Sequence, residues 1–159
     1  MPALLPREGL AQQEALGAPA GQVILTISGR ISVTNAQGEA QFDRAMLEAL
    51  GMERFTTRTP WYEGAITFEG VRMARLMERV VARGTTLTVT ALNDYATDIP
   101  IADFGRFGTL LALKRDGQYM SVRDRGPLFV VYPYDSTPEL NQRLYFARSA
   151  WQVARMAVR

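Results

Sequence analysis

The chain has 159 residues, of which 47% are hydrophobic and 21% charged, and this is the composition of one globular domain rather than of a disordered or fibrous chain. Lys and Arg together number 18 against 16 Asp and Glu, so the net charge is only +2. A balance this close to neutral does not indicate a nucleic-acid-binding protein.

Cysteine and histidine are both absent from the sequence. Their absence excludes disulfides, thiolate nucleophiles, thiolate-held metals and the Ser-His-Asp triad, and it removes the commonest general base near neutral pH. A metal site would need oxygen ligands alone, and the chain contains no Asp-x-Asp-x-Asp-Gly run. The composition therefore weighs against an enzyme without excluding one, and we expect no metal ligands.

Residues 1–22 are rich in Ala, Pro, Gln and Gly, which predicts a flexible N-terminal arm with a short helix at 9–16, followed by one domain at 23–159. The arm lacks the basic and apolar regions of a secretory signal, so we expect a cytoplasmic protein or one whose leader has been removed. No stretch reaches 18 apolar residues, and we expect no insertion into a membrane.

The first half of the domain shows two strand patterns and two helix patterns. Apolar residues alternate with polar ones from Val23 to Ser28, which predicts a strand. Asp43 is a good N-cap for a helix that ends at Gly51. A β-prone segment at 54–59 leads into a predicted loop at 59–64. A second helix is predicted at 71–82, where apolar residues recur at helical spacing: Met73, Leu76, Met77 and Val80.

The second half is richer in strand patterns. The predicted elements are a strand at 85–92, a polar loop at 93–100, a helical turn at 101–104, a hairpin at 109–122, a buried strand at 127–132, a short helix or turn at 138–144 and a closing strand at 150–158. About seven strands and two or three helices, without strict alternation, predict a single α+β domain with a mixed sheet.

Three polar segments each combine aromatic, amide or charged side chains with Gly or Pro, and each adjoins a predicted strand: 61–64, 93–95 and 123–127. Loops at the ends of strands commonly carry ligand sites. Aromatic faces could stack on a flat heteroaromatic ligand, and amides or carboxylates could bind its edge. The alternatives are that Trp61 packs in the core, that Asp94 forms an Asx turn, and that Arg123 and Asp124 belong to a solvated turn.

The order of these segments resembles the molybdopterin domain of sulfite oxidases. The resemblance is carried by Trp61 and Gly64 with Gly70-Val71 and Leu76, by Asn93-Asp94-Tyr95 with Ile99-Pro100, and by Leu110–Leu113 with Asp116-Gly117, Arg123–Pro127 and Val130–Pro133. It covers residues 23–158 and implies a single-domain, mixed-sheet sulfite oxidase (molybdopterin-binding) fold.

Two departures from the family pattern concern its metal. The family binds molybdenum through a cysteine upstream of the Trp-x-x-Gly segment, where this chain has Phe55-Thr56-Thr57-Arg58-Thr59. Threonine and arginine do not supply a soft sulfur ligand. The family's histidine before Gly-x-Pro is also missing, because Asp124-Arg125-Gly126-Pro127 stands there. Tyr95 falls on the family's active-site tyrosine, but no molybdenum is expected beside it.

The sequence therefore looks like the small, stand-alone, cysteine-free pterin-binding proteins of this superfamily, the PruR type. The resemblance implies a periplasmic, non-catalytic protein that binds a pterin as ligand. Its partner would be the periplasmic sensory domain of a membrane diguanylate cyclase/phosphodiesterase or kinase. The pocket residues implied are Trp61, Asn93, Asp94, Tyr95, Arg123 and Asp124. Two alternatives stay open: a molybdopterin-dependent oxidoreductase that lacks the cysteine ligand, and a protein-interaction module whose pocket has collapsed.

Overall fold

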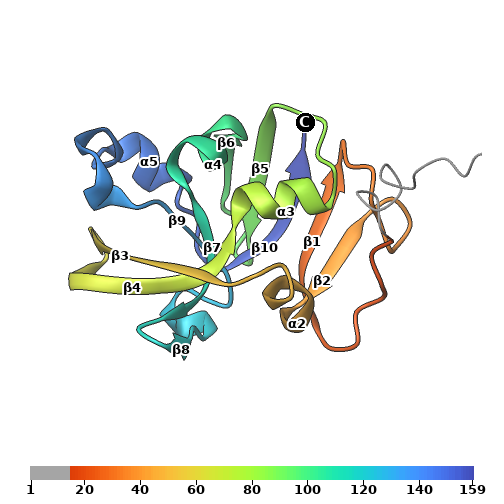
Figure 1. Ribbon diagram of the computed structural model, residues 1–159, viewed down its shortest axis with the longest axis horizontal. Helices are drawn as coiled ribbons and strands as arrows, with labels where there is room; N and C mark the ends of the chain where they lie inside the picture. The colour runs from red at the N-terminus through yellow and green to blue at the C-terminus, as the bar shows by residue number, and fades with distance from the viewer. Residues whose placement is uncertain (1–14) are drawn as a thin grey trace, which may run out of the picture.

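The computed structural model describes residues 15–159, so most of the helix expected at 9–16 lies outside the described part. Two five-stranded sheets pack around a shared core (Figure 1). The strands are β1 (Val23–Gly29), β2 (Ala40–Asp43), β3 (Glu53–Thr59), β4 (Tyr62–Arg72), β5 (Thr86–Ala91), β6 (Ala96–Pro100), β7 (Leu110–Arg115), β8 (Gln118–Tyr119), β9 (Phe129–Val131) and β10 (Val153–Val158). The helices are short: α2 (Arg44–Glu48), α3 (Met73–Arg79), α4 (Ala102–Phe107) and α5 (Arg143–Arg148), with 3-10 turns η1 (Val122–Asp124), η2 (Tyr134–Ser136) and η3 (Pro138–Leu140).

The first sheet has the strand order β2-β1-β10-β5-β6. The first and last strands of the chain's described part, β1 and β10, are therefore neighbours in it. β10 pairs in parallel with β1 and antiparallel with β5. The second sheet has the order β3-β4-β7-β8, and β9 pairs with β7. The mixed pairing and the few short helices confirm the predicted α+β domain.

The core between the sheets consists of large apolar side chains from both. Phe42, Leu25 and Ile27 come from the first sheet, and Phe68 and Phe129 from the second, all with no exposed surface. Burying a side chain of this size contributes about 1.5–3 kcal/mol.

Asp43 begins α2, as predicted, and it also holds the segment before β1. One carboxylate oxygen accepts from the backbone N–H of Met46 at 2.8 Å, and the other accepts from Ala20 and Gly21 at 3.0 and 2.9 Å. The hydrogen bonds from Gly21 and Met46 lower the pKa of Asp43. Farther along, the amide of Asn35 donates to the carbonyl of Gly17 at 2.9 Å. Residues 17–21 of the predicted arm are thus bonded to the domain.

The loop predicted at 59–64 and the helix predicted at 71–82 are both present but shorter than predicted: the turn comprises residues 60–61, and the helix is α3, Met73–Arg79. The chain turns at Pro60 and Trp61 and then forms β4, an 11-residue strand that reaches Arg72 before α3 begins. Strand β4 pairs with β3 along one edge and with β7 along the other. Pairing on both edges satisfies the backbone hydrogen-bonding groups of β4. Such tertiary pairing overrides the local turn and helix propensity of its residues.

The polar loop predicted at 93–100 is wrong over its second half, which forms β6. This strand is an edge of the first sheet and pairs only with β5. An edge strand keeps polar side chains on its solvent face: Thr88 donates to Asp98 at 2.7 Å, and Arg159 donates to the same carboxylate at 2.9 Å. These bonds lower the pKa of Asp98, Thr88 contributing most.

No helix between residues 15 and 159 has the length and apolar character needed to cross a membrane.

Candidate functional site

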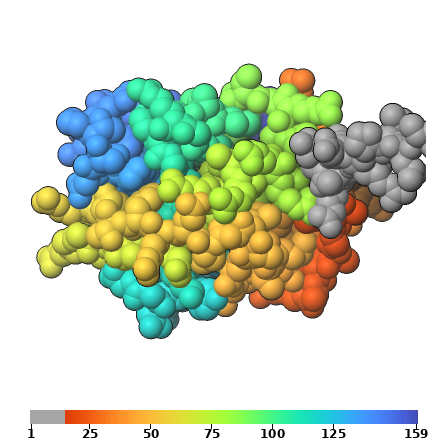
Figure 2. All heavy atoms as spheres, in the orientation of Figure 1, coloured from red at the N-terminus to blue at the C-terminus, as the bar shows by residue number. Residues whose placement is uncertain are grey.

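A pocket of about 410 Å³ lies where the β3–β4 turn, the β5–β6 turn and the end of α5 meet. Its wall is mainly aromatic and aliphatic, with a few polar groups, and the lining residues are Trp61, Ala91, Asn93, Tyr95, Phe146, Ala147, Ser149, Ala150 and Trp151. Figure 2 shows α5 and the tip of the β3–β4 hairpin together at one end of the molecule. The volume lies within the usual range for small-ligand pockets.

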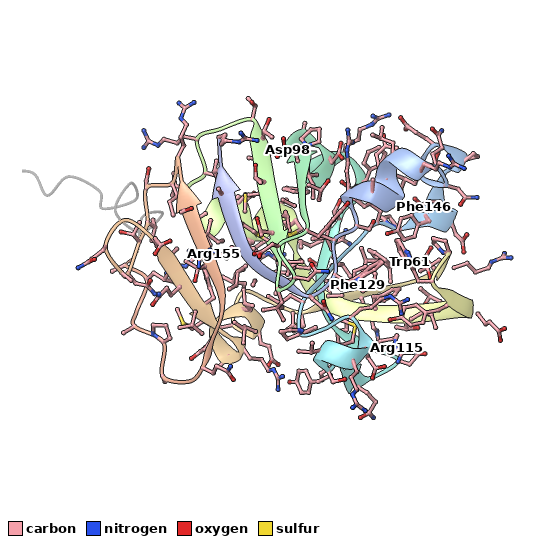
Figure 3. The ribbon with its side chains drawn as sticks, turned by 180° about the vertical axis from the view of Figure 1, so that it is seen from behind. Trp61, Asp98, Arg115, Phe129, Phe146 and Arg155 are labelled. Atoms are coloured by element: carbon pink, nitrogen blue, oxygen red, sulfur yellow. The ribbon has the colours of Figure 1, made fainter. Side chains whose placement is uncertain are left out.

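Trp61 forms the pocket wall on the β3–β4 side. The hydroxyl of Thr59 accepts hydrogen bonds from the backbone N–H groups of Trp61 and Tyr62, both at 3.2 Å, and so fixes the tight turn. The half-buried indole packs edge-on against aromatic rings at centroid distances of 5.5–5.9 Å: Phe129, Tyr134, Phe146 and Trp151. Trp61, Phe129 and Phe146 lie close together in Figure 3. These contacts hold the ring in one orientation.

Trp151 forms a second wall, in the turn between α5 and β10. Its ring stands at 78° to that of Trp61. The guanidinium of Arg125 lies 5.1 Å from the centroid of Trp151 and 4.8 Å from that of Tyr62. A cation over an aromatic face stabilises both groups, so Arg125 holds Trp151 and the start of β4 together.

The β5–β6 turn supplies the polar side of the pocket. The side-chain oxygen of Asn93 accepts from the N–H of Tyr95 at 3.1 Å, and Asp94 between them has a φ of 68°. Asparagine and aspartate tolerate such turns because their short side chains bond to the nearby backbone. The hydroxyl of Tyr95 donates to the carbonyl of Ala147 at 2.8 Å and so reaches α5.

The end of α5 completes the site and is held by buried polar groups. The Ser149 hydroxyl donates to the carbonyl of Tyr145 at 2.7 Å and hydrogen-bonds the Tyr134 hydroxyl. Nearby, Asp103 accepts from Arg148 at 2.9 Å and from Tyr132 at 2.8 Å. Burial raises the pKa values of Tyr132 and Tyr134, so both phenols stay protonated and act as donors.

The structure brings three of the six predicted pocket residues together. Trp61, Asn93 and Tyr95 line the pocket, whereas Asp94 is exposed in the same turn and outside the lining. Arg123 and Asp124 lie in η1, also outside the lining. Asp124 instead faces Arg115 at 3.9 Å and accepts from Ser121 at 3.4 Å.

The lining residues that sequence reasoning missed are Ala91, at the end of β5, and five residues of the segment from Phe146 to Trp151. The sequence pattern places Trp151 in a closing strand at 150–158, but β10 begins only at Val153. The one signal for Trp151 as a pocket residue is its position near the start of this predicted strand. A large ring at the end of a strand can face a ligand site as readily as the core.

Residues 55–59, which the sequence resemblance aligns with the cysteine-bearing segment of sulfite oxidases, present no sulfur ligand for molybdenum. Thr57 in β3 is buried, and its hydroxyl is committed twice, donating to the carbonyl of Arg58 and accepting from the N–H of Asp135, both at 3.1 Å. Between residues 15 and 159, no three Asp or Glu side chains gather as a metal site. The aromatic walls and the amide of Asn93 do fit a flat heteroaromatic ring, which needs stacking faces and a few polar groups.

Comparisons with known proteins show the fold. No family model matches the chain, and no curated protein matches its sequence. The sulfane dehydrogenase SoxCD from Paracoccus pantotrophus is similar in structure, with a TM-score of 0.64 at 15% identity over 84% of this chain. The chain spans 37% of the length of that SoxCD chain. The similarity confirms the predicted sulfite oxidase-type α+β fold.

Proposed function

We propose that this protein binds a pterin without transforming it and presents the bound state to a membrane signalling partner. The proposal rests chiefly on one observation: an open pocket whose walls are two tryptophans and whose polar side is Asn93 and Tyr95. The sulfite oxidase-type fold and the sequence resemblance to cysteine-free pterin-binding proteins support the ligand class.

A pterin is a flat bicyclic ring with one face to stack and one edge of alternating donors and acceptors. Trp61 and Trp151 offer ring faces or edges. The amide of Asn93 can donate and accept, and the Ala147 carbonyl can accept a second bond. The chain's own groups would therefore hold and orient the ring.

The chemistry of the lining supports binding rather than catalysis. None of the nine lining residues is Asp, Glu, Lys or Arg, and Tyr95 is the only titratable one. A general acid–base mechanism needs a positioned group whose pKa lies near the working pH, and an activated nucleophile needs a base beside it. The lining offers neither arrangement.

We propose that the signal passes through the two elements that form the pocket. The pocket lies between the β5–β6 turn and α5, which the Tyr95 hydroxyl already joins. A ligand that contacts both elements would favour the conformation in which they are held together, and a partner could prefer that conformation. The periplasmic location, and a diguanylate cyclase/phosphodiesterase or kinase sensory domain as partner, come from the sequence resemblance.

Trp fluorescence tests the ligand directly, because the chain has two tryptophans and both line the pocket. Titration with tetrahydrobiopterin or monapterin should change the emission with a single Kd well below about 1 mM, the affinity that corresponds to only ~4 kcal/mol. Asn93→Ala should weaken binding, whereas the matched variant Asn141→Ala, at an exposed asparagine outside the pocket, should not. An unchanged emission up to millimolar ligand would favour an interaction module.

The enzyme alternative has a separate test. Protein purified from its native host would be analysed for molybdenum. A stoichiometric content would overturn the non-catalytic proposal and indicate an oxidoreductase that binds the metal without cysteine.

A further inference from the structure

One guanidinium touches two segments that carry the walls of the pocket. Arg125 caps η1, and its guanidinium carbon lies 5.1 Å from the ring centroid of Trp151 and 4.8 Å from that of Tyr62. Trp151 lines the pocket, and Tyr62 follows the lining residue Trp61 in the chain. Arg125 itself lies outside the lining. Any effect that it has on the pocket therefore passes through the side chains that it contacts.

The charge of Arg125 is not neutralised by a carboxylate of the described chain. Within residues 15–159 its guanidinium forms no ion pair or hydrogen bond, and its Nε is buried. Asp124, its neighbour in the chain, faces Arg115 at 3.9 Å instead. A cation that is half removed from water needs compensation, and the faces of aromatic rings can supply it. The rings of Trp151 and Tyr62 are thus the partners of this charge.

The backbone holds Arg125 beside the turn that carries Trp151. The Arg125 carbonyl accepts from the N–H of Gln152 at 2.9 Å, and the Gln152 amide donates to the carbonyl of Val122 at 2.7 Å. The φ of Arg125 is 70°, in the left-handed region that favours glycine. Glycine would relieve this strain but would leave Trp151 without its cation. A strained residue with a defined contact at a ligand pocket points to a role for its side chain.

We propose that Arg125 is a positioning residue of the pocket, and that its charge holds the Trp151 ring in place as a wall for the ligand. This inference rests on the proposed function, because it assigns a further residue to that site. Trp151 packs edge-on against Trp61 and Phe129 at 5.7 and 6.0 Å, and Arg125 adds a contact over its ring. A wall that is already fixed lowers the ordering cost of binding.

Acrylamide quenching of the ligand-free protein tests the positioning. In a Trp61→Phe background, Trp151 is the remaining tryptophan, so its emission reports on this ring alone. Arg125→Met keeps a long side chain and the backbone strain but removes the charge, and we expect stronger quenching. Arg125→Lys restores a cation and should reverse part of the change. Arg123→Met removes an exposed arginine from the same 3-10 turn and should leave the quenching unchanged.

Titration with tetrahydrobiopterin, with both tryptophans present, tests the consequence for binding. The Kd should rise about tenfold in Arg125→Met, as expected for the loss of one partly desolvated cation–π contact. It should lie between the two values in Arg125→Lys and at the parent value in Arg123→Met.

Unchanged quenching or a parent-like Kd in Arg125→Met would overturn the positioning role, and so would a lysine variant that behaves like the methionine variant. If the parent fails to bind the pterin while the quenching changes as expected, the proposed ligand alone is overturned. The quenching series needs no ligand, so the two failures are distinguishable.

Discussion

The hydroxyl of Tyr95 donates a 2.8 Å hydrogen bond to the carbonyl of Ala147, and this bond joins the β5–β6 turn to α5 beside the candidate pocket. Residues 95 and 147 are 52 positions apart in the sequence, so the bond sets the relative position of two otherwise separate walls. Anything that loosens it should change the pocket more than the stability of the whole domain.

Tyr95→Phe should therefore weaken pterin binding while lowering the free energy of unfolding by no more than about 1 kcal/mol, the usual contribution of one hydrogen bond. Tyr119→Phe is the matched control, because that phenol is similarly exposed and also donates, to Glu48 at 3.0 Å. Fluorescence titration and urea unfolding of both variants measure the two effects. Equal affinities for the two variants would contradict a role for Tyr95 in the pocket.

Arg148→Met should destabilise the protein strongly, by about 3 kcal/mol, because it leaves the buried carboxylate of Asp103 without its cation. The surface pair of Arg106 with Glu139, at 2.7 Å, provides the control: Arg106→Met should cost no more than about 1 kcal/mol. Denaturant unfolding measures both. A similar, small effect at the two positions would show that Asp103 is held by Tyr132 alone.

Gly70→Ala should destabilise the second sheet, because a Cβ at residue 70 would lie 2.0 Å from the carbonyl oxygen of Leu111 and 2.6 Å from the Cα of Ala112. Both are backbone atoms of β7, so neither can rotate away, and we expect a loss of about 2 kcal/mol or more. Gly105→Ala in α4 meets nothing within 4 Å and should stabilise the helix by up to about 1 kcal/mol. In thermal unfolding, we expect the Tm to fall in Gly70→Ala and to rise in Gly105→Ala.

Acid should destabilise the parent protein partly through Asp43. Folding lowers the pKa of this carboxyl through the backbone hydrogen bonds from Gly21 and Met46. The sign follows from linkage: the contribution is complete above the unfolded pKa of about 4 and is lost as the pH falls through the lower folded value. Asp43→Asn should therefore show a smaller loss of stability between about pH 5 and pH 3. Urea midpoints measured across that range give the comparison, and parallel pH profiles would contradict it.

The elements that could be predicted from sequence are those with a strong local signal. The alternation in β1 and β5, the cap at Asp43 and the Asp116-Gly117 turn of the β7–β8 hairpin all appear as expected. Strand β4 could not be predicted, because its pairing with both β3 and β7 is decided by residues far away in the sequence. Segment 71–82 has helical spacing, but β4 takes its first two residues.

Three of the six predicted site residues line the pocket and three do not, for a similar reason. Trp61, Asn93 and Tyr95 stand in turns with recognisable chemistry, and turns at strand ends meet at the edge of a fold. Arg123 and Asp124 stand in such a turn as well, yet η1 lies outside the pocket lining. Sequence position alone could not show that Trp151, rather than Arg123, faces the ligand site.

The place of β10 in the middle of the first sheet has a consequence for biosynthesis. Residues 153–158 separate β1 from β5, so the strands at the start of the domain have no central neighbour until these residues leave the ribosome. The complete first sheet therefore cannot assemble until residues 153–158 have been synthesised and are free to pair. Emergence of the first strands alone does not complete its pairing.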